Sequence, residues 1–460
     1  MSTDPAKKYF TEERRWQSWL DVEGALARVQ AEAGVIPDWA GPEISAVANL
    51  ESLDLDALQA EVRKTMAPVY ALSRALAAAC GPAGSWVHWG ATTQNVIDAG
   101  RLLVLEEVQR EIKERLANVL CCLADMAETH SETPMVGRTN RQHALPITFG
   151  FKLAGWIDEL VRVCDQLEEC ENRLFLLRFG GAIGAFQSLG EAGPAISTRL
   201  AEELGLKPAQ HEGRAQVDVS IEYVSRLGML GVAATRMAGE LYEAMQSEIR
   251  ELTEDLGHDV VGSSTMPHKV NPKLVVTLKA DANRLRGLGA SAFSITPASF
   301  EGDAVTNREL WRLVEDTVVG ALSVASGLKT VLDAVTIDAD RMAMTLASSA
   351  EETALESVMM HLAPKIGRAA AHDVLHEAAA RARDTGTALQ TLVQNMPEVT
   401  NALDRETLLR LFDPVLNTGQ SARVTRQIVA VGRERAKALA SEPSESRRAL
   451  ATFGSAAQRA

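Results

Sequence analysis

The sequence lacks paired cysteine motifs and has few aromatic residues. Its 460 residues include five cysteines, none of them in a CxxC pair, and only 5% are aromatic. The cysteines lie in helical patterns at positions 80, 121, 122, 164 and 170, and their number is odd. Buried free thiols in a reducing compartment are therefore expected, rather than disulfides or a metal site.

An excess of positive charge and long uncharged apolar runs are also missing. The formal charge of −14 argues against nucleic acid or an anionic membrane surface as a partner. Residues 1–16 contain no apolar signal segment, and no later run is both long and uncharged enough to cross a bilayer. We therefore expect a cytoplasmic protein with no membrane or nucleic-acid partner and no cofactor.

Alternating strand patterns are nearly absent, whereas helical periodicity is abundant. Residues 101–130 contain no Gly or Pro and carry apolar residues at three-and-four spacing. Further helices are expected through 157–167, at 218–256, from about 272, at 313–332 and at 367–386. Such long segments predict an all-α fold with a bundle of roughly 40 Å or more. We expect an N-terminal helical cap at 1–100, a long-helix bundle at 101–350 and a C-terminal helical domain at 351–460.

Polar residues that break helices gather in four stretches. They are "HWGATTQNVID" (88–98), "GRTNRQHALPITFG" (137–150), "RFGGAIGAFQSLGEAG" (178–193) and "GSSTMPHKVNPK" (262–273). The first suits either a carboxylate at a helix N-terminus or a simple capping turn. No strand precedes the glycine-rich third stretch, so it does not fit a dinucleotide-binding loop. Together the stretches indicate a site for a small polyanion.

The last of these stretches holds the residues best suited to chemistry. Lys269 and Asn271 are suited to hold a carboxylate, and either Ser263 or Ser264 offers a hydroxyl acid or base. An unperturbed serine is a poor base and needs a nearby ammonium and backbone N–H groups to stabilise its alkoxide. No acidic partner stands near a nucleophile elbow, which disfavours acyl transfer.

The stretch "GSSTMPHKVNP" resembles the signature of the fumarase/aspartase superfamily, roughly GSSxMPxKxNP. "GATTQNVIDAG" and "GRTNRQHALPITFG" are similar to the first and second regions of that superfamily, in the same order and spacing. The resemblance implies three mostly helical domains and a homotetramer with a central helical bundle. It also implies active sites shared between three subunits, and anti-β-elimination that releases fumarate from a substituted succinate.

The resemblance also implies roles for individual residues. Ser263 corresponds to the proton-abstracting base on a flexible loop, and Lys269 and Asn271 to ligands of the substrate carboxylates. Further carboxylate contacts are implied at Thr92, Thr93 and Gln94 in the first region and at Arg138 and Thr139 in the second. His88 and Gln216 are additional candidates for the pocket, and no metal ligand is implied.

Within the superfamily, residues 178–193 and 371–386 resemble the branch of adenylosuccinate lyases and 3-carboxy-cis,cis-muconate cycloisomerases. Trp311 stands where cycloisomerase-like members tend to carry Trp, while Val217 and Gly302 stand where the branch carries arginines. Asn140 occupies the position of a general-acid His. A leaving group that departs as a stable anion or neutral amine needs little protonation, so the resemblance favours ammonia, an amine or nitrite.

Three functions remain open at this point. The first is a lyase that cleaves a C–N or similar bond of a substituted succinate, with Asn140 bonded to the substituent. The second is a cycloisomerase acting on a carboxymuconate-type tricarboxylate. The third is a non-catalytic structural tetramer, as in members of the superfamily that serve as lens crystallins. The intact Ser263, Lys269 and Asn271 speak against the third.

Overall fold

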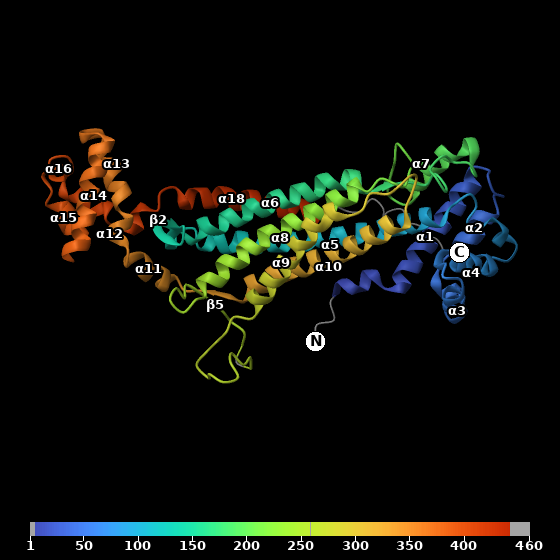
Figure 1. The fold of residues 1–460 in the computed structure, drawn as a ribbon, viewed down its shortest axis with the longest axis horizontal. Coiled ribbons are helices and arrows are strands. Elements are labelled where there is room, and N and C mark those ends of the chain that lie inside the picture. Colours follow the sequence, from blue (N-terminus) through green and yellow to red (C-terminus); the bar gives the residue numbers. More distant parts are fainter. Residues whose placement is uncertain (1–4, 258, 442–460) are drawn as a thin grey trace.

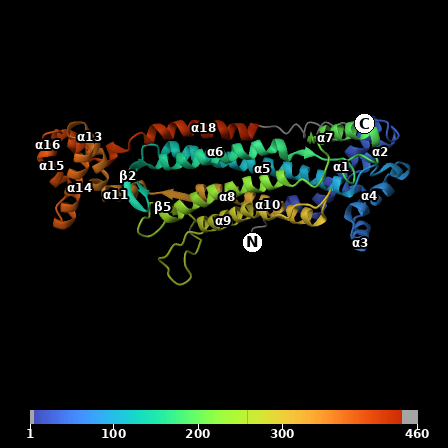
Figure 2. The same cartoon turned by 45° about the horizontal axis from the view of Figure 1, so that its top comes forward.

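A long bundle with a smaller cluster of helices at each end forms the molecule (Figures 1 and 2). The structure is a computed structural model that describes residues 5–257 and 259–441. Helices dominate, and the only strands among these residues form three two-stranded sheets. The predicted all-α class is confirmed, because these short strands only join or brace the helices.

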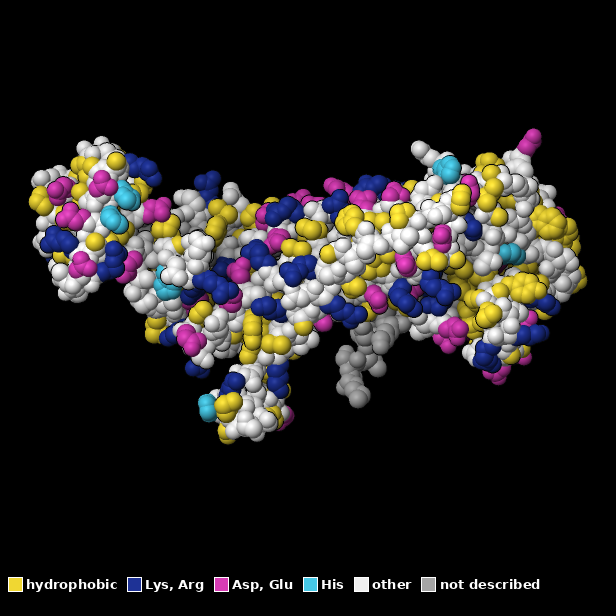
Figure 3. Space-filling view, in the orientation of Figure 1, with side chains coloured by type: hydrophobic (Ala, Val, Ile, Leu, Met, Phe, Trp, Pro, Cys, Tyr) yellow, Lys and Arg dark blue, Asp and Glu magenta, His cyan; other side chains and the backbone are white. Residues whose placement is uncertain are grey.

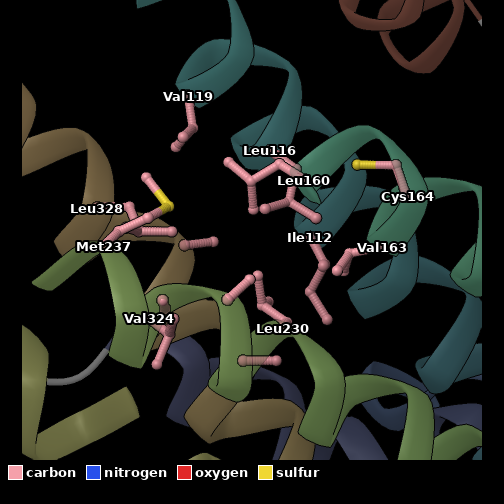
Figure 4. Close-up of a cluster of buried hydrophobic side chains, with 14 of the residues drawn as sticks. Ile112, Leu116, Val119, Leu160, Val163, Cys164, Leu230, Met237, Val324 and Leu328 are labelled. Carbon is pink, nitrogen blue, oxygen red and sulfur yellow. The ribbon is translucent and has the colours of Figure 1, made fainter. Parts of the chain in front are cut away.

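Six helices build the bundle. They are α5 (Thr93–Thr129), α6 (Phe149–Leu174), α8 (Asp218–Ala244), α9 (Leu274–Ser291), α10 (Ala304–Ala334) and α18 (Ser421–Ser441). Ile112 and Leu116 of α5 meet Leu160 of α6 and Leu230 of α8 in the core (Figure 4). Burial of each such side chain contributes about 1.5–3 kcal/mol. The apolar stripes seen in the sequence are therefore the faces that hold the bundle together.

The N-terminal end of the chain forms a cluster around the start of α5. Its elements are η1 (Pro5–Phe10), α1 (Glu12–Glu32), α2 (Ala40–Val47), η2 (Leu50–Ser52), α3 (Leu55–Thr65), α4 (Pro68–Ala79) and η3 (Gly81–Trp86). Residues 177–206 pack into the same apolar core. This segment starts at the end of β3 (Leu176–Leu177), contains η4 (Gly190–Ala192) and α7 (Gly193–Glu203), and is followed by β4 (Lys207–Pro208). This cap thus draws on a segment beyond residue 100.

A second cluster lies at the opposite end of the bundle, at the left of Figure 1. It contains α12 (Ala350–Thr353), α13 (Leu355–Ile366), α14 (Arg368–Thr385), α15 (Leu389–Gln394), α16 (Pro397–Thr400), α17 (Arg405–Leu411) and η6 (Pro414–Asn417). Its own apolar core spans residues 354–412. The helix predicted at 367–386 is α14, which lies between Gly367 and Gly386, both with positive φ.

After this cluster the chain returns to the bundle as α18. Arg433 pairs with Asp125 and Glu128 of α5, at 2.8 and 2.7 Å. Arg435 pairs with Glu168 of α6 at 2.6 Å. The division into three domains stays a prediction, but packing places α18 with the bundle rather than with the rest of 351–460. The sequence gives no sign of which core a late helix joins.

The predicted helix 218–256 is wrong at its C-terminal end. Helix α8 ends at Ala244, and Arg250 adopts a positive φ of 53°. The chain then forms β5 (Leu252–Glu254), which pairs antiparallel with β6 (Val335–Ile337), and α11 (Ala339–Ala347) follows β6. No Gly or Pro marks this end before Gly257. The break is set by long-range strand pairing, which local periodicity does not reveal.

Helix α10 qualifies the expectation that no run could span a bilayer. By length and composition alone it reaches the range of a membrane-spanning helix, and half of its most apolar window is buried inside the molecule. It packs against α5, α8 and α9. A core helix meets the same criterion, and this packing gives α10 that role in the bundle.

All five cysteines are free, as expected, but they are not all buried. Cys80, Cys164 and Cys170 are buried, whereas Cys121 is exposed on α5. Burial raises the pKa of Cys164 to about 12, so this thiol stays protonated and unreactive. The interior cysteines therefore act as small apolar side chains.

Candidate active site

The signature stretch lies on a long loop between β5 and α9. The loop projects from the side of the bundle as a separate knob (Figures 1 and 3). Most of its side chains are exposed, including Lys269, whereas Ser263 and Asn271 are partly buried. Residue 258 lies outside the described residues. The loop thus carries its polar groups away from the chain's own core.

Ser263 is held by the backbone of its own loop. Its Oγ accepts hydrogen bonds from the backbone N–H groups of Met266, at 3.1 Å, and Thr265, at 3.4 Å. Hydrogen bonds from N–H donors stabilise an oxygen more strongly when it is negatively charged. This arrangement favours the alkoxide that a serine base requires.

Two neighbouring residues set the shape of the loop. Asn271 Nδ2 donates a hydrogen bond to the backbone oxygen of Gly262 at 3.0 Å. A Cβ added to Gly262 would lie 2.4 Å from the backbone oxygen of Lys269, so only glycine allows this close approach. In this chain the Asn271 amide closes the loop, a role that the predicted carboxylate contact did not include.

Glu254 anchors the loop to α9 and was not found from the sequence. Its carboxylate accepts hydrogen bonds from the backbone N–H groups of Lys273, Leu274 and Val275, at 2.7, 3.1 and 2.7 Å. Such a contact satisfies the unpaired N–H groups of the first helical turn and complements the helix dipole. An acid that caps a helix from 19 residues away leaves no local pattern.

The first region begins α5. Thr92 is the N-cap residue, and Asn95 Oδ1 accepts from Thr92 N at 3.4 Å and from Gly181 N at 3.1 Å. Gln94 Nε2 donates to Asp98 Oδ1 at 2.7 Å, while Thr93 is exposed. The capping turn and the predicted carboxylate site thus coincide, and of Thr92, Thr93 and Gln94 only Thr93 is exposed.

His88 forms a buried pair with a residue that sequence reasoning missed. Its Nδ1 lies 2.5 Å from Oε1 of Glu23 on α1, and the Glu23 side chain is only 2% exposed. Burial by itself lowers the pKa of His88, but the hydrogen bond and charge of Glu23 outweigh burial and raise it above the usual value. Only the fold brings the two residues together, since 65 positions separate them.

This pair predicts a pH-dependent contribution to stability. Because the pKa of His88 is raised in the folded state, the pair stabilises fully below the unfolded-state pKa of about 6.5. That contribution is lost as pH rises through the folded-state pKa. The His88→Gln variant should therefore be destabilised most at acidic pH, and the difference from wild type should shrink as pH rises. Urea unfolding at one protein concentration and several pH values measures the free energy of unfolding of both proteins. A difference between them that does not change with pH would contradict the charged pair.

The second region forms the hairpin of β1 (Pro134–Thr139) and β2 (Gln142–Thr148). Asn140 and Arg141 make its two-residue turn with φ of 50° and 65°. Asn is among the residues that best adopt this turn conformation. Thr139 and Asn140 are both exposed. The residue at the family's general-acid position therefore also serves the turn.

Arg138 is engaged within its own chain. Its two terminal nitrogens donate to the carboxylate of Glu251 at 3.0 and 2.7 Å, and the Glu251 side chain is 1% exposed. Both residues line a cleft of about 970 Å³ between the hairpin, α6, α8 and α11. A guanidinium has five N–H groups, so the pair with Glu251 leaves Arg138 further donors for a ligand in this cleft.

The three regions do not meet within one chain. The first region begins α5 and the second follows its C-terminal end, and at 1.5 Å per residue the 37 residues of α5 span about 55 Å. The signature loop leaves the bundle toward solvent, away from the start of α5 (Figure 1). Gln216 lies near the first region, exposed, with Nε2 3.3 Å from His211 Nδ1. The described chain thus presents separate parts of a site.

Known proteins resemble this chain over nearly its whole length. A family model described as Lyase matches residues 1–287, and one described as Adenylosuccinate lyase C-terminus matches residues 354–428. The 3-carboxy-cis,cis-muconate cycloisomerase of Pseudomonas aeruginosa is 36% identical over 91% of this chain and 92% of its own. The chain belongs to the fumarase/aspartase superfamily, in the branch of adenylosuccinate lyases and 3-carboxy-cis,cis-muconate cycloisomerases.

Other members of the superfamily are similar at comparable levels. The N-acetyl-S-(2-succino)cysteine lyase of Enterococcus italicus is 29% identical over 93% of this chain and 94% of its own. The crystal structure of a fumarate lyase from Mesorhizobium sp. BNC1 superposes with a TM-score of 0.86 and 30% identity, over 93% of this chain and 97% of that one. These superfamily relatives carry different activities, so similarity alone leaves the reaction open.

Trp311, noted in the sequence for its resemblance to cycloisomerase-like members, lies next to the first region. Trp311 on α10 lies beneath the guanidinium of Arg101, 4.6 Å from the ring centre, and Arg101 is 3.3 Å from Asp98. A guanidinium over an indole ring is a favourable cation–π contact. Trp311 therefore joins the apolar core of the bundle, against which it packs, to the polar surroundings of the first region.

Proposed function

We propose that the protein catalyses anti-β-elimination from a substituted succinate and releases fumarate, with Ser263 as the base. Removing a proton beside a carboxylate creates a dianion, whose charge must be met by fixed donors and cations. Lys269, Asn271, Thr92, Thr93, Gln94, Arg138 and Thr139 are the residues proposed to meet it. Membership in the superfamily supports an elimination of this kind. The identity of the leaving group, such as ammonia, an amine or nitrite, is part of what we propose.

The observation that carries this proposal is the pair of N–H groups aimed at Ser263. Both donors belong to the same loop, so their geometry does not depend on any other element. Lys269 lies six positions along the same loop and adds a positive charge nearby. A base built this way acts once the loop closes over the bound substrate, which also excludes water.

A homotetramer with shared sites is part of the same proposal. The three regions lie apart in one chain, yet the elimination needs base and carboxylate contacts around one small molecule. The outer faces of α8 and α9 carry exposed apolar side chains suited to packing against further copies, namely Met229, Val232, Tyr242 and Val276. Loops and helix ends from different copies would then complete each site.

Asn140 gives a test of the leaving group. If its amide bonds an amino or nitro substituent, Asn140→Ala should cut turnover of that substrate. Asn140→Gly is the matched variant, because glycine keeps the positive φ of the turn while it also removes the amide. Equal losses in both variants would assign the effect to the amide. Unchanged kinetics in both would remove Asn140 from the mechanism.

A second candidate is a cycloisomerase that forms a lactone from a carboxymuconate-type tricarboxylate. It is favoured by Trp311, which stands at the position typical of cycloisomerase-like members, and by the 36% identity to a cycloisomerase. The two candidates use the same type of proton transfer beside a carboxylate. They differ in whether fumarate leaves.

The experiment that separates the candidates follows ultraviolet absorbance of the product double bond on a panel of purified substrates. The panel contains aspartate, malate, adenylosuccinate, argininosuccinate, nitrosuccinate and carboxymuconate. Fumarate released from one succinate supports the elimination and identifies the leaving group. Consumption of carboxymuconate alone supports the cycloisomerase. No reaction on any substrate would contradict both and favour a structural tetramer.

A further inference from the structure

A small polar cavity lies beside the first region, where four segments meet. It has a volume of about 60 Å³, and its lining includes Asp98, Arg178, Arg214, Gln216 and Asn307. One water molecule needs about 10–15 Å³ of such space, so the cavity has room for a group the size of a carboxylate. Asp98 lies one helical turn after Gln94, which places the cavity next to the predicted carboxylate contacts.

Arg214 fills the space that a side chain at residue 302 would take. A Cβ built on Gly302 would lie 3.1 Å from Nη2 and 3.2 Å from Nε of Arg214. The absence of a side chain at residue 302 therefore leaves room for the guanidinium of Arg214.

The guanidinium of Arg214 acts on Asp98 through its charge, but it makes no hydrogen bond or ion pair among the described residues. Its Nε is buried without a hydrogen-bond partner, and no ion pair of Arg178 or Arg214 occurs in the parts of the chain that the structure describes. Asp98 is engaged by Gln94 at 2.7 Å and by Arg101 at 3.3 Å. Two arginines therefore face the cavity with one acid that already has partners. Buried donors left unpaired are costly, which points to a ligand.

We propose that Arg214, with Arg178 beside it, binds a carboxylate of the substrate additional to the two of the succinate skeleton. The proposal rests on the proposed function and narrows its substrate class to a tricarboxylate, or a succinate whose substituent carries a carboxylate. Arginine suits this role because its planar donors match a carboxylate in two parallel hydrogen bonds. Gly302 contributes by leaving room for the guanidinium.

Titration calorimetry with two probes tests the proposal on the full-length protein. The probes are fumarate and propane-1,2,3-tricarboxylate, compared for wild type and Arg214→Gln. We expect the variant to bind the tricarboxylate at least about tenfold more weakly, as for loss of a charge-assisted hydrogen bond, with fumarate affinity unchanged. Arg173→Gln is the charge-matched control, because Arg173 pairs with Glu222 on the surface. Gly302→Ala should weaken the binding of the tricarboxylate only, because the added methyl group displaces the guanidinium of Arg214.

Loss of selectivity between the two probes would count against Arg214. Equal weakening of both probes would make it a general or structural residue, and unchanged affinity for both would remove it from the site. If wild type binds neither probe, urea unfolding decides. If Arg214→Gln is as stable as wild type or more stable, the guanidinium does not stabilise the fold, which supports a role in ligand binding. If Arg214→Gln is less stable, the proposal is overturned. Selective loss of tricarboxylate binding would support the inference even if no panel substrate released fumarate.

Discussion

Replacing Ser263 by alanine is expected to lower kcat about 10²- to 10⁴-fold, the range of a lost general base. The physical reason is that two backbone N–H groups favour the charged form of this one oxygen, and alanine leaves them without an acceptor. The affinity for fumarate should change little, because the base acts on the proton rather than on the carboxylates. Steady-state kinetics on the substrate that reacts, together with fumarate binding, measures both quantities.

The neighbouring hydroxyl provides the matched comparison. Ser264 is exposed on the same loop, so Ser264→Ala removes the same hydroxyl group from the neighbouring position. We expect its kcat to stay near that of wild type. A large loss in Ser264→Ala, with Ser263→Ala active, would transfer the base to the second serine. Activity in both variants would end the serine mechanism.

Mixing two inactive variants is expected to restore activity. Ser263→Ala removes the base, and Thr93→Asp places a negative charge where the substrate carboxylate is proposed to bind. Thr93 is exposed at the first helical position of α5, where an acid is favoured by the helix dipole, so this variant should fold. If each site takes these residues from different subunits, random one-to-one mixing leaves ½ × ½, about a quarter, of the sites intact.

The control for mixing uses two changes in one loop. Ser263→Ala mixed with Lys269→Ala should show no recovery, since both residues come from the same copy of the loop. Native mass spectrometry confirms that mixed oligomers have formed. Mixed oligomers without recovered activity in the Thr93→Asp experiment would show that the two regions do not belong to different subunits of one site.

The sequence predicted those parts of the fold that depend on local periodicity. Helices α5, α6 and α10 follow from their apolar spacing, although α10 begins nine residues before the predicted 313, at Ala304. There Asp303 caps the helix by accepting from Val305 N at 2.7 Å. The end of α8 and the three small sheets depend on partners far along the chain. Periodicity within a window cannot report them.

The site shows the same division. The signature stretch pointed to Ser263 as a candidate because its polar residues are contiguous in sequence, whereas the contacts of Glu23, Glu251 and Arg214 were not predicted. Glu23 and Glu251 are acids on otherwise ordinary segments, and each finds its partner, His88 or Arg138, across 65 or 113 positions. Arg214 offered one weak signal, an arginine three positions before Val217, where a branch arginine is absent.

The return of α18 to the bundle bears on how the chain folds during its synthesis. Val429, Ala436 and Leu439 complete a core whose other members lie before residue 343. The roughly one hundred residues between the ends of α10 and α18 take about 5 to 20 s to translate. Until they emerge from the ribosome, the face of α5 and α6 that receives α18 has no cover. The cluster at 354–412, which has its own core, can fold during that interval. The face of α5 and α6, although made earlier, is therefore covered by α18 only at the end of synthesis.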